Sequence, residues 1–304
     1  MSLEAAKTEF IEAGGIRFAF RRFGAATGTP VVFLQHFTGN MDSWDPAVVN
    51  GLAETRPVIV FNNAGVGTTT GVTPDSVEQM SMDAETFIKA LGLPAIDLIG
   101  FSLGGMLAQV LAVRNRGLIR NIVVAGAAPL GGEEHLLSVV EDAFSRRPRD
   151  VRLPLFFTAS DVSQRAGREF VARATIRSKD RDPESGESVS GPQAKAIIGW
   201  CARKDEGVGM LRTIDQSTLI VHGSDDTMFP SINAYNMFKA MKNAQLILYP
   251  DSGHGAIFQY PELFVAHCRT FLDARATAAA PQSSGSQMSA APPSPTQSTS
   301  AACG

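Results

Sequence analysis

A serine between two glycines is the feature of this sequence best suited to chemistry. Residues 100–104 read Gly-Phe-Ser-Leu-Gly, directly after an apolar run, Ile96 to Ile99, that predicts a buried strand. A helical apolar pattern begins at Leu103, so the motif lies in a strand-turn-helix context in which such a turn presents the serine hydroxyl and leaves no room for side chains at the glycines. We therefore predict Ser102 as a nucleophile and the amide of Leu103 as a donor to a developing oxyanion. The alternative is a glycine-rich turn in which the serine only caps the helix.

A serine hydroxyl is a poor nucleophile unless a base accepts its proton. The sequence has five histidines, and His254 follows the predicted strand Leu246 to Tyr249 in an Asp-Ser-Gly-His-Gly loop. A residue in this loop can reach Ser102 from the carboxyl edge of a parallel sheet, so we predict His254 as the general base. The remaining histidines are expected to be structural, and that at position 36 to brace its loop: His36, His135, His222 and His267.

The carboxylate that orients this histidine is expected after the next-to-last predicted strand. Two adjacent candidates, Asp225 and Asp226, occur there, and only one can face the histidine because neighbouring turn residues point in different directions. A second oxyanion donor is expected from the loop after the predicted strand Val31 to Gln35. In this loop the amide of Phe37 or of Thr38 could face a substrate carbonyl.

These residues must be positioned by an alternation of strands and helices, which is typical of a mostly parallel sheet with helices on both faces. The alternation stops over residues 129–209, a mainly helical segment too long for a plain loop. We therefore predict a helical lid there, between a first core part (1–128) and a second (210–275), followed by a disordered Ala-, Ser- and Pro-rich tail (276–304). Strands are predicted at 31–35, 58–61, 96–99, 122–125, 218–221 and 246–249, helices at 76–91, 103–113 and 261–274, and an antiparallel pair over 9–24.

Two groups of residues in the predicted lid bear on function. Its apolar side chains are expected either to line a substrate pocket or to form the lid's own core. The mixed charges of residues 177–182 indicate a solvated surface. The apolar group consists of Phe144, Leu155, Phe156, Phe157 and Trp200.

Composition excludes several classes of protein. The chain is 44% apolar and 19% charged with a net charge of −3, which is typical of a globular enzyme and not of a nucleic-acid binder. No apolar run approaches the ~20 residues of a membrane span, and residues 1–10 lack the apolar core of a secretory signal, so we expect a cytoplasmic protein. Cys201, Cys268 and Cys303 are far apart and predict reduced thiols. Since no phosphate loop, metal cluster or cofactor motif stands out, we expect no cofactor and no metal.

The order Ser102, then an aspartate, then His254 resembles that of the α/β-hydrolase superfamily. The resemblance covers about residues 10–274 and is closest to a lid-bearing branch of bacterial esterases, cofactor-free haloperoxidases (perhydrolases) and C–C bond hydrolases. In that family the acid lies in a G-x-x-D-x-x-x-P turn. Gly223, Asp226 and Pro230 match this turn, so the resemblance implies Asp226 as the acid.

The sequence departs from the family pattern in two places. The usual H-G-x oxyanion loop appears as His36-Phe37-Thr38, so its glycine is replaced. The usual D-x-R-G-x-G-x-S segment reads Asn-Asn-Ala-Gly-Val-Gly-Thr-Thr over residues 62–69, so the ion pair of its Asp and Arg is expected to be absent.

The resemblance implies a serine hydrolase that cleaves a carboxylic ester or related acyl compound of a partly apolar small molecule through an acyl-enzyme. The alternatives are perhydrolysis, lactone hydrolysis or C–C bond cleavage by the same residues. A ligand-binding protein that uses the same scaffold without turnover is an alternative from another class.

Overall fold

The computed structural model describes residues 1–204 and 207–274, so the tail predicted at 276–304 lies outside the described residues. The strands are β1 (Glu9–Ala13), β2 (Ile16–Gly24), β3 (Val31–Leu34), β4 (Pro57–Phe61), β5 (Ile96–Phe101), β6 (Ile119–Ala125), β7 (Ser217–Gly223) and β8 (Ala244–Tyr249). The helices are η1 (Met41–Ser43, a 3-10 helix), α1 (Pro46–Ala53), α2 (Val77–Ala90), α3 (Leu103–Arg114), α4 (Leu136–Ser145), α5 (Arg152–Phe156), α6 (Asp161–Ala174), α7 (Glu187–Ala202), α8 (Gly207–Arg212), α9 (Ile232–Ala240), α10 (Ala256–Gln259) and α11 (Pro261–Asp273).

The strands form one sheet in the order β1-β2-β4-β3-β5-β6-β7-β8. β1 pairs with β2 and β2 with β4 in antiparallel fashion, and all other neighbours are parallel. The chain moves outward from β3 to β4 in one direction and returns to β5 on the other side of β3. In such sheets ligands bind at the carboxyl ends of the strands where the order reverses, which here means the ends of β3 and β5.

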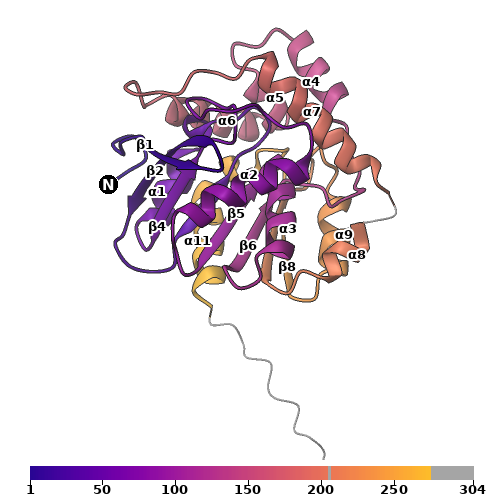
Figure 1. Ribbon diagram of the computed structural model, residues 1–304. Coiled ribbons are helices and arrows are strands. Elements are labelled where there is room, and N and C mark those ends of the chain that lie inside the picture. The colour runs from indigo at the N-terminus through magenta and orange to yellow at the C-terminus, as the bar shows by residue number, and fades with distance from the viewer. Residues whose placement is uncertain (205–206, 275–304) are drawn as a thin grey trace, which may run out of the picture. The chain divides into compact units, whose positions relative to one another are not determined.

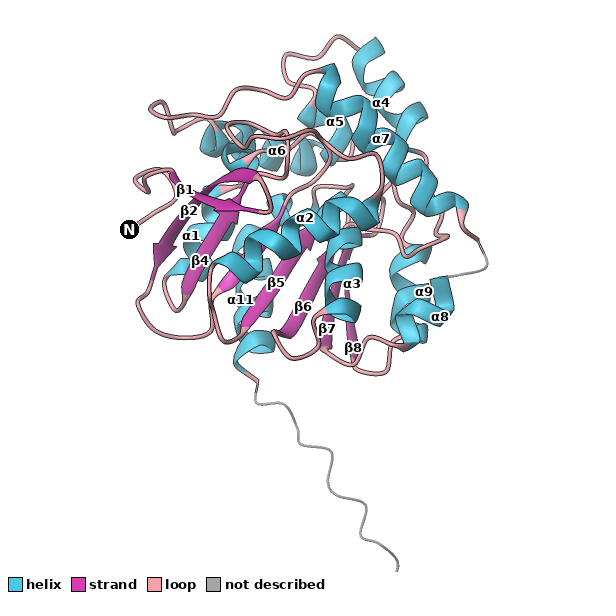
Figure 2. Cartoon of the chain, viewed as in Figure 1, coloured by secondary structure: helices cyan, strands magenta, loops and turns pink. Residues whose placement is uncertain are grey.

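Two apolar cores lie on the two faces of the sheet, because side chains alternate along each strand. Val32 and Leu34 of β3 point into one core, which the apolar faces of α2, α3 and α9 complete. Val31 and Phe33 point into the other core, completed by α1, α10 and α11. Figure 2 shows α2 and α3 in front of the sheet. The inner strands β3 to β7 are covered on both sides and read as nearly continuous apolar runs, whereas the edge strand β8 is partly exposed.

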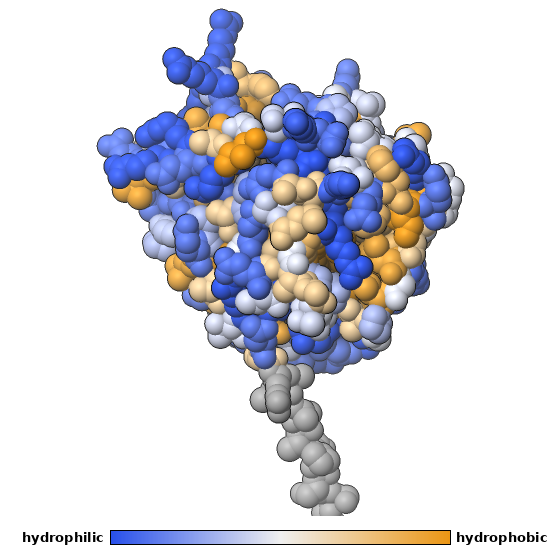
Figure 3. Space-filling model, turned by 90° about the vertical axis from the view of Figure 1, so that its left-hand side faces the viewer, coloured by the Kyte–Doolittle hydropathy of each residue, from blue (hydrophilic) through white to orange (hydrophobic). Residues whose placement is uncertain are grey.

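Helices α4 to α8 form an insertion between β6 and β7, and its last helix, α8, extends three residues beyond the segment 129–209 predicted as a lid. Figure 1 shows α4, α5, α6 and α7 above one end of the sheet, next to the turn between β5 and α3. On the face drawn in Figure 3, hydrophilic side chains are interspersed with small hydrophobic groups. None of the helices in the described ranges is long and apolar enough to cross a membrane.

The predicted sheet with helices on both faces is confirmed, and each predicted strand overlaps an observed one. Helices α1 and α9 were not predicted. A signal for α1 is present, because Asp45 accepts a hydrogen bond from the Ala47 amide as an N-cap and Pro46 occupies the first turn.

Candidate active site

The turn between β5 and α3 holds Ser102 in a strained conformation. Its φ of 57° and ψ of −120° lie in a region that favours glycine. A β-carbon on Gly104 would lie 2.0 Å from the carbonyl oxygen of Leu34, and one on Gly100 would lie 2.2 Å from that of Gly104. The two flanking glycines are therefore required by close backbone approach, and the surrounding chain fixes the serine in its strained turn.

The structure brings His254 and Asp226 together from the ends of two neighbouring strands. The Nδ1 atom of His254 lies 2.9 Å from Oδ2 of Asp226. The other carboxylate oxygen accepts the amides of Met228 and Phe229 at 2.9 and 3.0 Å. Burial by itself would raise the Asp226 pKa, but the two histidines beside it outweigh burial and hold that pKa below its ordinary value. Asp225, the alternative acid, is exposed and accepts a bond from Ser224.

A second histidine contacts the same carboxylate. His222 is buried at the end of β7, with Nε2 2.7 Å from the carbonyl oxygen of Phe229 and 3.2 Å from Oδ2 of Asp226. A carbonyl oxygen only accepts, so Nε2 of His222 carries a proton and also faces the carboxylate. His222 thus helps to hold the acid in place. The sequence analysis missed this contact, although His222 lies only four residues before Asp226.

The serine hydroxyl makes no hydrogen bond to the histidine. Among the described residues Ser102 Oγ is buried and has no hydrogen-bond partner. Ser102 is 1% exposed and His254 3% exposed, so the two side chains are closed off from solvent. The aromatic rings of Phe101, Phe156 and Phe229 surround the imidazole with centroids 4.9 to 5.8 Å away. Catalytic hydrogen bonds often form only when substrate is bound, so an unpartnered hydroxyl is compatible with the role predicted for Ser102.

The loop after β3 contains the two candidate oxyanion amides. Thr38 has a positive φ of 60°, and its amide donates to Oε1 of Gln193 in α7 at 2.6 Å. By contrast, the amides of Phe37 and Leu103 meet no acceptor within the described part of the chain. The geometry therefore leaves Phe37 and Leu103 available to a substrate oxygen, whereas the Thr38 amide is occupied.

Two further side chains shape this loop. The Gln35 carboxamide donates to the carbonyl oxygen of Asn40 and accepts the amide of His36 at 3.2 Å, so it spans the loop. The ring of His36 lies with Nδ1 2.8 Å from the Phe37 carbonyl oxygen, and the backbone carbonyl oxygen of His36 accepts the amide of Gly39 at 3.0 Å. Burial lowers the pKa of His36 to about 4 and keeps its ring neutral. His36 therefore bonds within its own loop, as expected, and Gln35 adds a second brace that reaches Asn40.

The insertion is fastened to the loop that carries His254. Asp251 accepts the hydroxyls of Thr158 and Ser160 at 2.7 and 2.6 Å. The amide of Gly255 donates to the carbonyl oxygen of Phe156 at 2.8 Å. Of the apolar residues singled out in this segment, Phe156, Phe157 and Trp200 are buried, and Phe144 is exposed.

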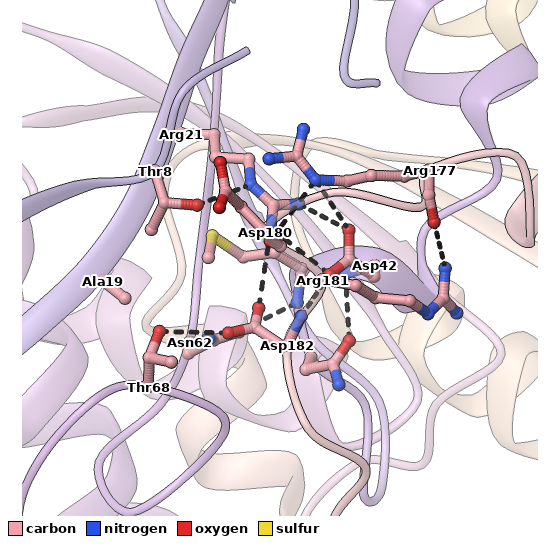
Figure 4. A network of polar contacts seen from close by, with 12 residues as sticks. Thr8, Ala19, Arg21, Asp42, Asn62, Thr68, Arg177, Asp180, Arg181 and Asp182 are labelled. Carbon is pink, nitrogen blue, oxygen red and sulfur yellow. Dashed lines mark hydrogen bonds and ion pairs between the residues drawn. The ribbon is translucent and has the colours of Figure 1, made fainter. Parts of the chain in front are cut away.

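The charges at residues 177–182 form the predicted solvated surface only in part: Lys179, Asp180 and Arg181 are exposed, whereas Arg177 and Asp182 are buried. Arg21 of β2 binds Asp42 through two bonds of 2.6 and 3.2 Å, and Asp42 also accepts the amide of Asp182 at 2.7 Å (Figure 4). Arg21, Asp42, Asp182 and Arg177 are all buried. The prediction was wrong for Arg177 and Asp182 because most of their partners, among them Asp42 of η1, lie more than 110 residues earlier in the chain.

This network also bears on the segment at Asn62 that departs from the family pattern. Asn62 accepts the amide of Met41, next to Asp42 in η1 (Figure 4). A β-carbon on Gly67 would lie 2.8 Å from a carboxylate oxygen of Asp182. An ion-paired network built from other residues therefore lies beside the segment whose own ion pair is missing.

The remaining titratable groups offer no metal site. Within residues 1–204 and 207–274, no group of three or more His, Cys, Asp or Glu side chains could hold a metal ion. Cys201 and Cys268 are buried free thiols, and burial raises the pKa of Cys201 to about 12. Both thiols therefore stay protonated and unreactive at neutral pH, and Cys303 lies outside the described residues.

Comparison with known proteins places this geometry in context. Residues 29–261 match the model of the alpha/beta hydrolase fold family. An alpha/beta hydrolase fold protein from Chitinophaga pinensis superimposes with a TM-score of 0.84 and 39% sequence identity, over 90% of this chain and all of that one.

Two curated relatives have more specific names. The 2-hydroxy-6-oxo-6-(2'-aminophenyl)hexa-2,4-dienoic acid hydrolase of Metapseudomonas resinovorans is 26% identical over 88% of this chain and 91% of its own. A non-heme haloperoxidase of Rhodococcus erythropolis is 25% identical over 79% of this chain and 90% of its own.

Proposed function

Because this chain belongs to the α/β-hydrolase fold family, we propose that it is a serine hydrolase that cleaves a carboxylic ester or a related acyl compound. Ser102 is the nucleophile, His254 the general base and Asp226 the acid that orients the base. The observation that carries the proposal is the 2.9 Å contact between the Asp226 carboxylate and Nδ1 of His254. These residues follow β7 and β8 of the sheet in which Ser102 follows β5, in a turn that requires glycine on both sides.

The roles follow from the donor and acceptor capacity of each group. The carboxylate can only accept, so the proton of a neutral His254 lies on Nδ1 and leaves Nε2 free to take the proton of Ser102. The serine oxygen then attacks the substrate carbonyl, and the amides of Phe37 and Leu103 donate to the oxyanion. Each such donor is worth about 3 kcal/mol in the transition state. His254 returns its proton to the leaving alcohol and next activates a water that hydrolyses the acyl-enzyme.

The side chains around this centre favour a partly apolar small molecule. Phe37 and Leu155 both pack against the core that contains Leu103, on the side of the sheet covered by α3 and α7. Apolar walls with a few polar groups are typical of small-molecule sites.

Cleavage of a C–C bond by the same residues is a second candidate, supported by the relative that is named as the hydrolase of an oxo-dienoic acid. A perhydrolase is supported in the same way by the haloperoxidase relative. Both candidate reactions use the same nucleophile as ester hydrolysis. The labelling experiment below therefore tests the nucleophile, and the ester series that follows tests whether an ester bond is cleaved.

The proposal is tested by treating the wild type, Ser102→Ala and Ser224→Ala with a fluorophosphonate and measuring intact mass and peptide maps. We expect one adduct per chain on Ser102 in the wild type and in Ser224→Ala, whose exposed serine lies outside the site, and none in Ser102→Ala. A chain-length series of p-nitrophenyl esters then gives kcat/KM. A folded wild type that gives neither adduct nor turnover would overturn the proposal and favour ligand binding without turnover.

A further inference from the structure

Gln193 is a buried polar side chain on the insertion helix that faces the oxyanion loop. It is 0% exposed, and its Oε1 atom accepts the amide of Thr38 at 2.6 Å. Its Nε2 atom is also buried and has no hydrogen-bond partner among the described residues. A carboxamide nitrogen carries two N–H donors, so one end of this side chain is satisfied and the other is not. Buried groups of this kind are rare in folded proteins and call for a partner.

The helix that carries Gln193 shows that packing alone does not require a polar residue there. The other buried side chains of α7 recur at helical spacing and are mostly apolar, and Gln193 interrupts their stripe. A Leu or Met would fill the same space without an unpaired side-chain donor, although the amide of Thr38 would lose its acceptor. These neighbours are Val189, Ala196, Ile197, Trp200 and Cys201.

The side chain that carries the unpartnered nitrogen contacts the predicted oxyanion loop. Gln193 bonds the amide next to that of Phe37, which is free, and Ser102 Oγ is likewise buried without a partner. Beside the hydroxyl of Ser102 and the amide of Phe37, the Nε2 atom of Gln193 is therefore a third polar group without a partner among the described residues.

The surroundings favour a neutral acceptor as the partner of Nε2. The ring of His36 beside this loop is kept neutral by burial. Arg152 is a cation that interacts electrostatically with His36. Its guanidinium is already bonded to the Asp150 carboxylate through three contacts of 2.5 to 3.2 Å. A substrate carboxylate would therefore be buried without a compensating charge, whereas an oxo or ester oxygen needs only a donor.

We propose that Gln193 is a specificity-determining residue that holds the oxyanion loop through Oε1 and donates from Nε2 to a second, uncharged carbonyl oxygen in the acyl part of the substrate. The inference rests on the proposed serine hydrolase function. It assigns the preferred substrate class as oxo-acyl or diester compounds, in which a second carbonyl lies a few bonds from the scissile one.

The test compares two esters of equal chain length, p-nitrophenyl pentanoate and p-nitrophenyl 4-oxopentanoate, with each kcat/KM divided by the ester's hydroxide-catalysed rate. The enzymes are the wild type, Gln193→Met and Gln164→Met. Gln164 is the matched control, because it lies on another insertion helix and its Nε2 is satisfied by the Thr158 carbonyl oxygen at 2.8 Å.

We expect the wild type to prefer the oxo ester by about tenfold or more, because a site built to hydrogen-bond a substrate group rejects the analogue that lacks it. Gln193→Met should bring the ratio to within about twofold of one and also lower kcat on both esters, since the oxyanion loop loses its anchor. Gln164→Met should keep the wild-type ratio. Circular dichroism and thermal melting establish that each variant is folded.

Either of two results would overturn the inference: a wild type that does not discriminate between the esters, or a folded Gln193→Met that keeps the wild-type preference. Failure of the proposed function gives a different pattern, in which neither ester is turned over and Ser102 gives no fluorophosphonate adduct. Turnover of the plain ester with no oxo preference would leave the serine hydrolase proposal standing and remove only the role of Gln193.

Discussion

Replacement of Asp226 by asparagine changes one atom, and the structure dictates how the new side chain must lie. Oδ1 of Asp226 accepts the amides of Met228 and Phe229 at 2.9 and 3.0 Å, whereas Oδ2 faces Nδ1 of His254 at 2.9 Å. An asparagine NH₂ group at the Oδ1 position would meet two N–H donors. The asparagine oxygen must therefore stay at Oδ1, which puts the NH₂ group against His254.

That orientation imposes the wrong tautomer on the base. The NH₂ group can only donate, so Nδ1 of His254 must give up its proton and the ring carries it on Nε2 instead. Nε2 then cannot accept the proton of Ser102. The same exchange in a Ser-His-Asp protease lowers kcat about 10⁴-fold, which corresponds to about 5.5 kcal/mol of transition-state stabilisation. We expect a loss of about that size here.

The assay is kcat/KM on the best p-nitrophenyl ester, together with the rate of fluorophosphonate labelling, which depends on the same activated serine. Both should fall together in Asp226→Asn while circular dichroism stays unchanged. Asp225→Asn is the control, because the neighbouring carboxylate is exposed and should change the rate by less than about twofold. If folded Asp226→Asn keeps more than about a tenth of the activity, or if Asp225→Asn loses as much, the assignment of the acid is refuted.

Three further predictions concern stability, measured by urea denaturation. Gly104→Ala should lower the free energy of unfolding by about 3 kcal/mol or more, because the new β-carbon would lie 2.0 Å from the Leu34 carbonyl oxygen. Arg21→Met should cost about 3–5 kcal/mol, because Asp42 stays buried with a weakened set of partners. His36 has a folded-state pKa of about 4, so as pH falls from about 6.5 the unfolded chain binds a proton that the folded chain does not, and stability is lost. His36→Gln should remove about 2–3 kcal/mol of the stability difference between pH 7.5 and pH 4.5.

Each of these predictions has a control and a contradicting result. Gly117→Ala should be tolerated, since nothing lies within 4 Å of its added β-carbon; equal stability of the two alanine variants would refute the steric argument. A variant at His135, which is exposed in the insertion, should keep the wild-type pH dependence. If His36→Gln also keeps the wild-type pH dependence of stability, His36 is not a buried neutral group. An Arg21→Met variant as stable as the wild type would mean that the buried network contributes little net stability.

The sequence by itself was sufficient to predict the sheet and the serine turn, because the signals for both lie in short stretches of chain. Apolar runs such as Val31–Leu34 are buried on both faces, and their composition shows it directly. In the serine turn the need for Gly100 is local, since a β-carbon there would lie 2.2 Å from the carbonyl oxygen of Gly104, whereas Gly104 is required by the approach of Leu34 in β3. Steric exclusion between residues close in the sequence can be inferred from the sequence and needs no knowledge of the rest of the fold.

Only the tertiary structure decided which polar groups meet across the chain. The choice between the Phe37 and Thr38 amides depends on Gln193, which lies 155 residues after Thr38. The burial of Asp182 depends in the same way on Asp42, 140 residues earlier. A charged or amide side chain has the same local sequence signal whether it is solvated or paired. Its partner, and hence its role, exists only once the sheet and the inserted helices have packed together.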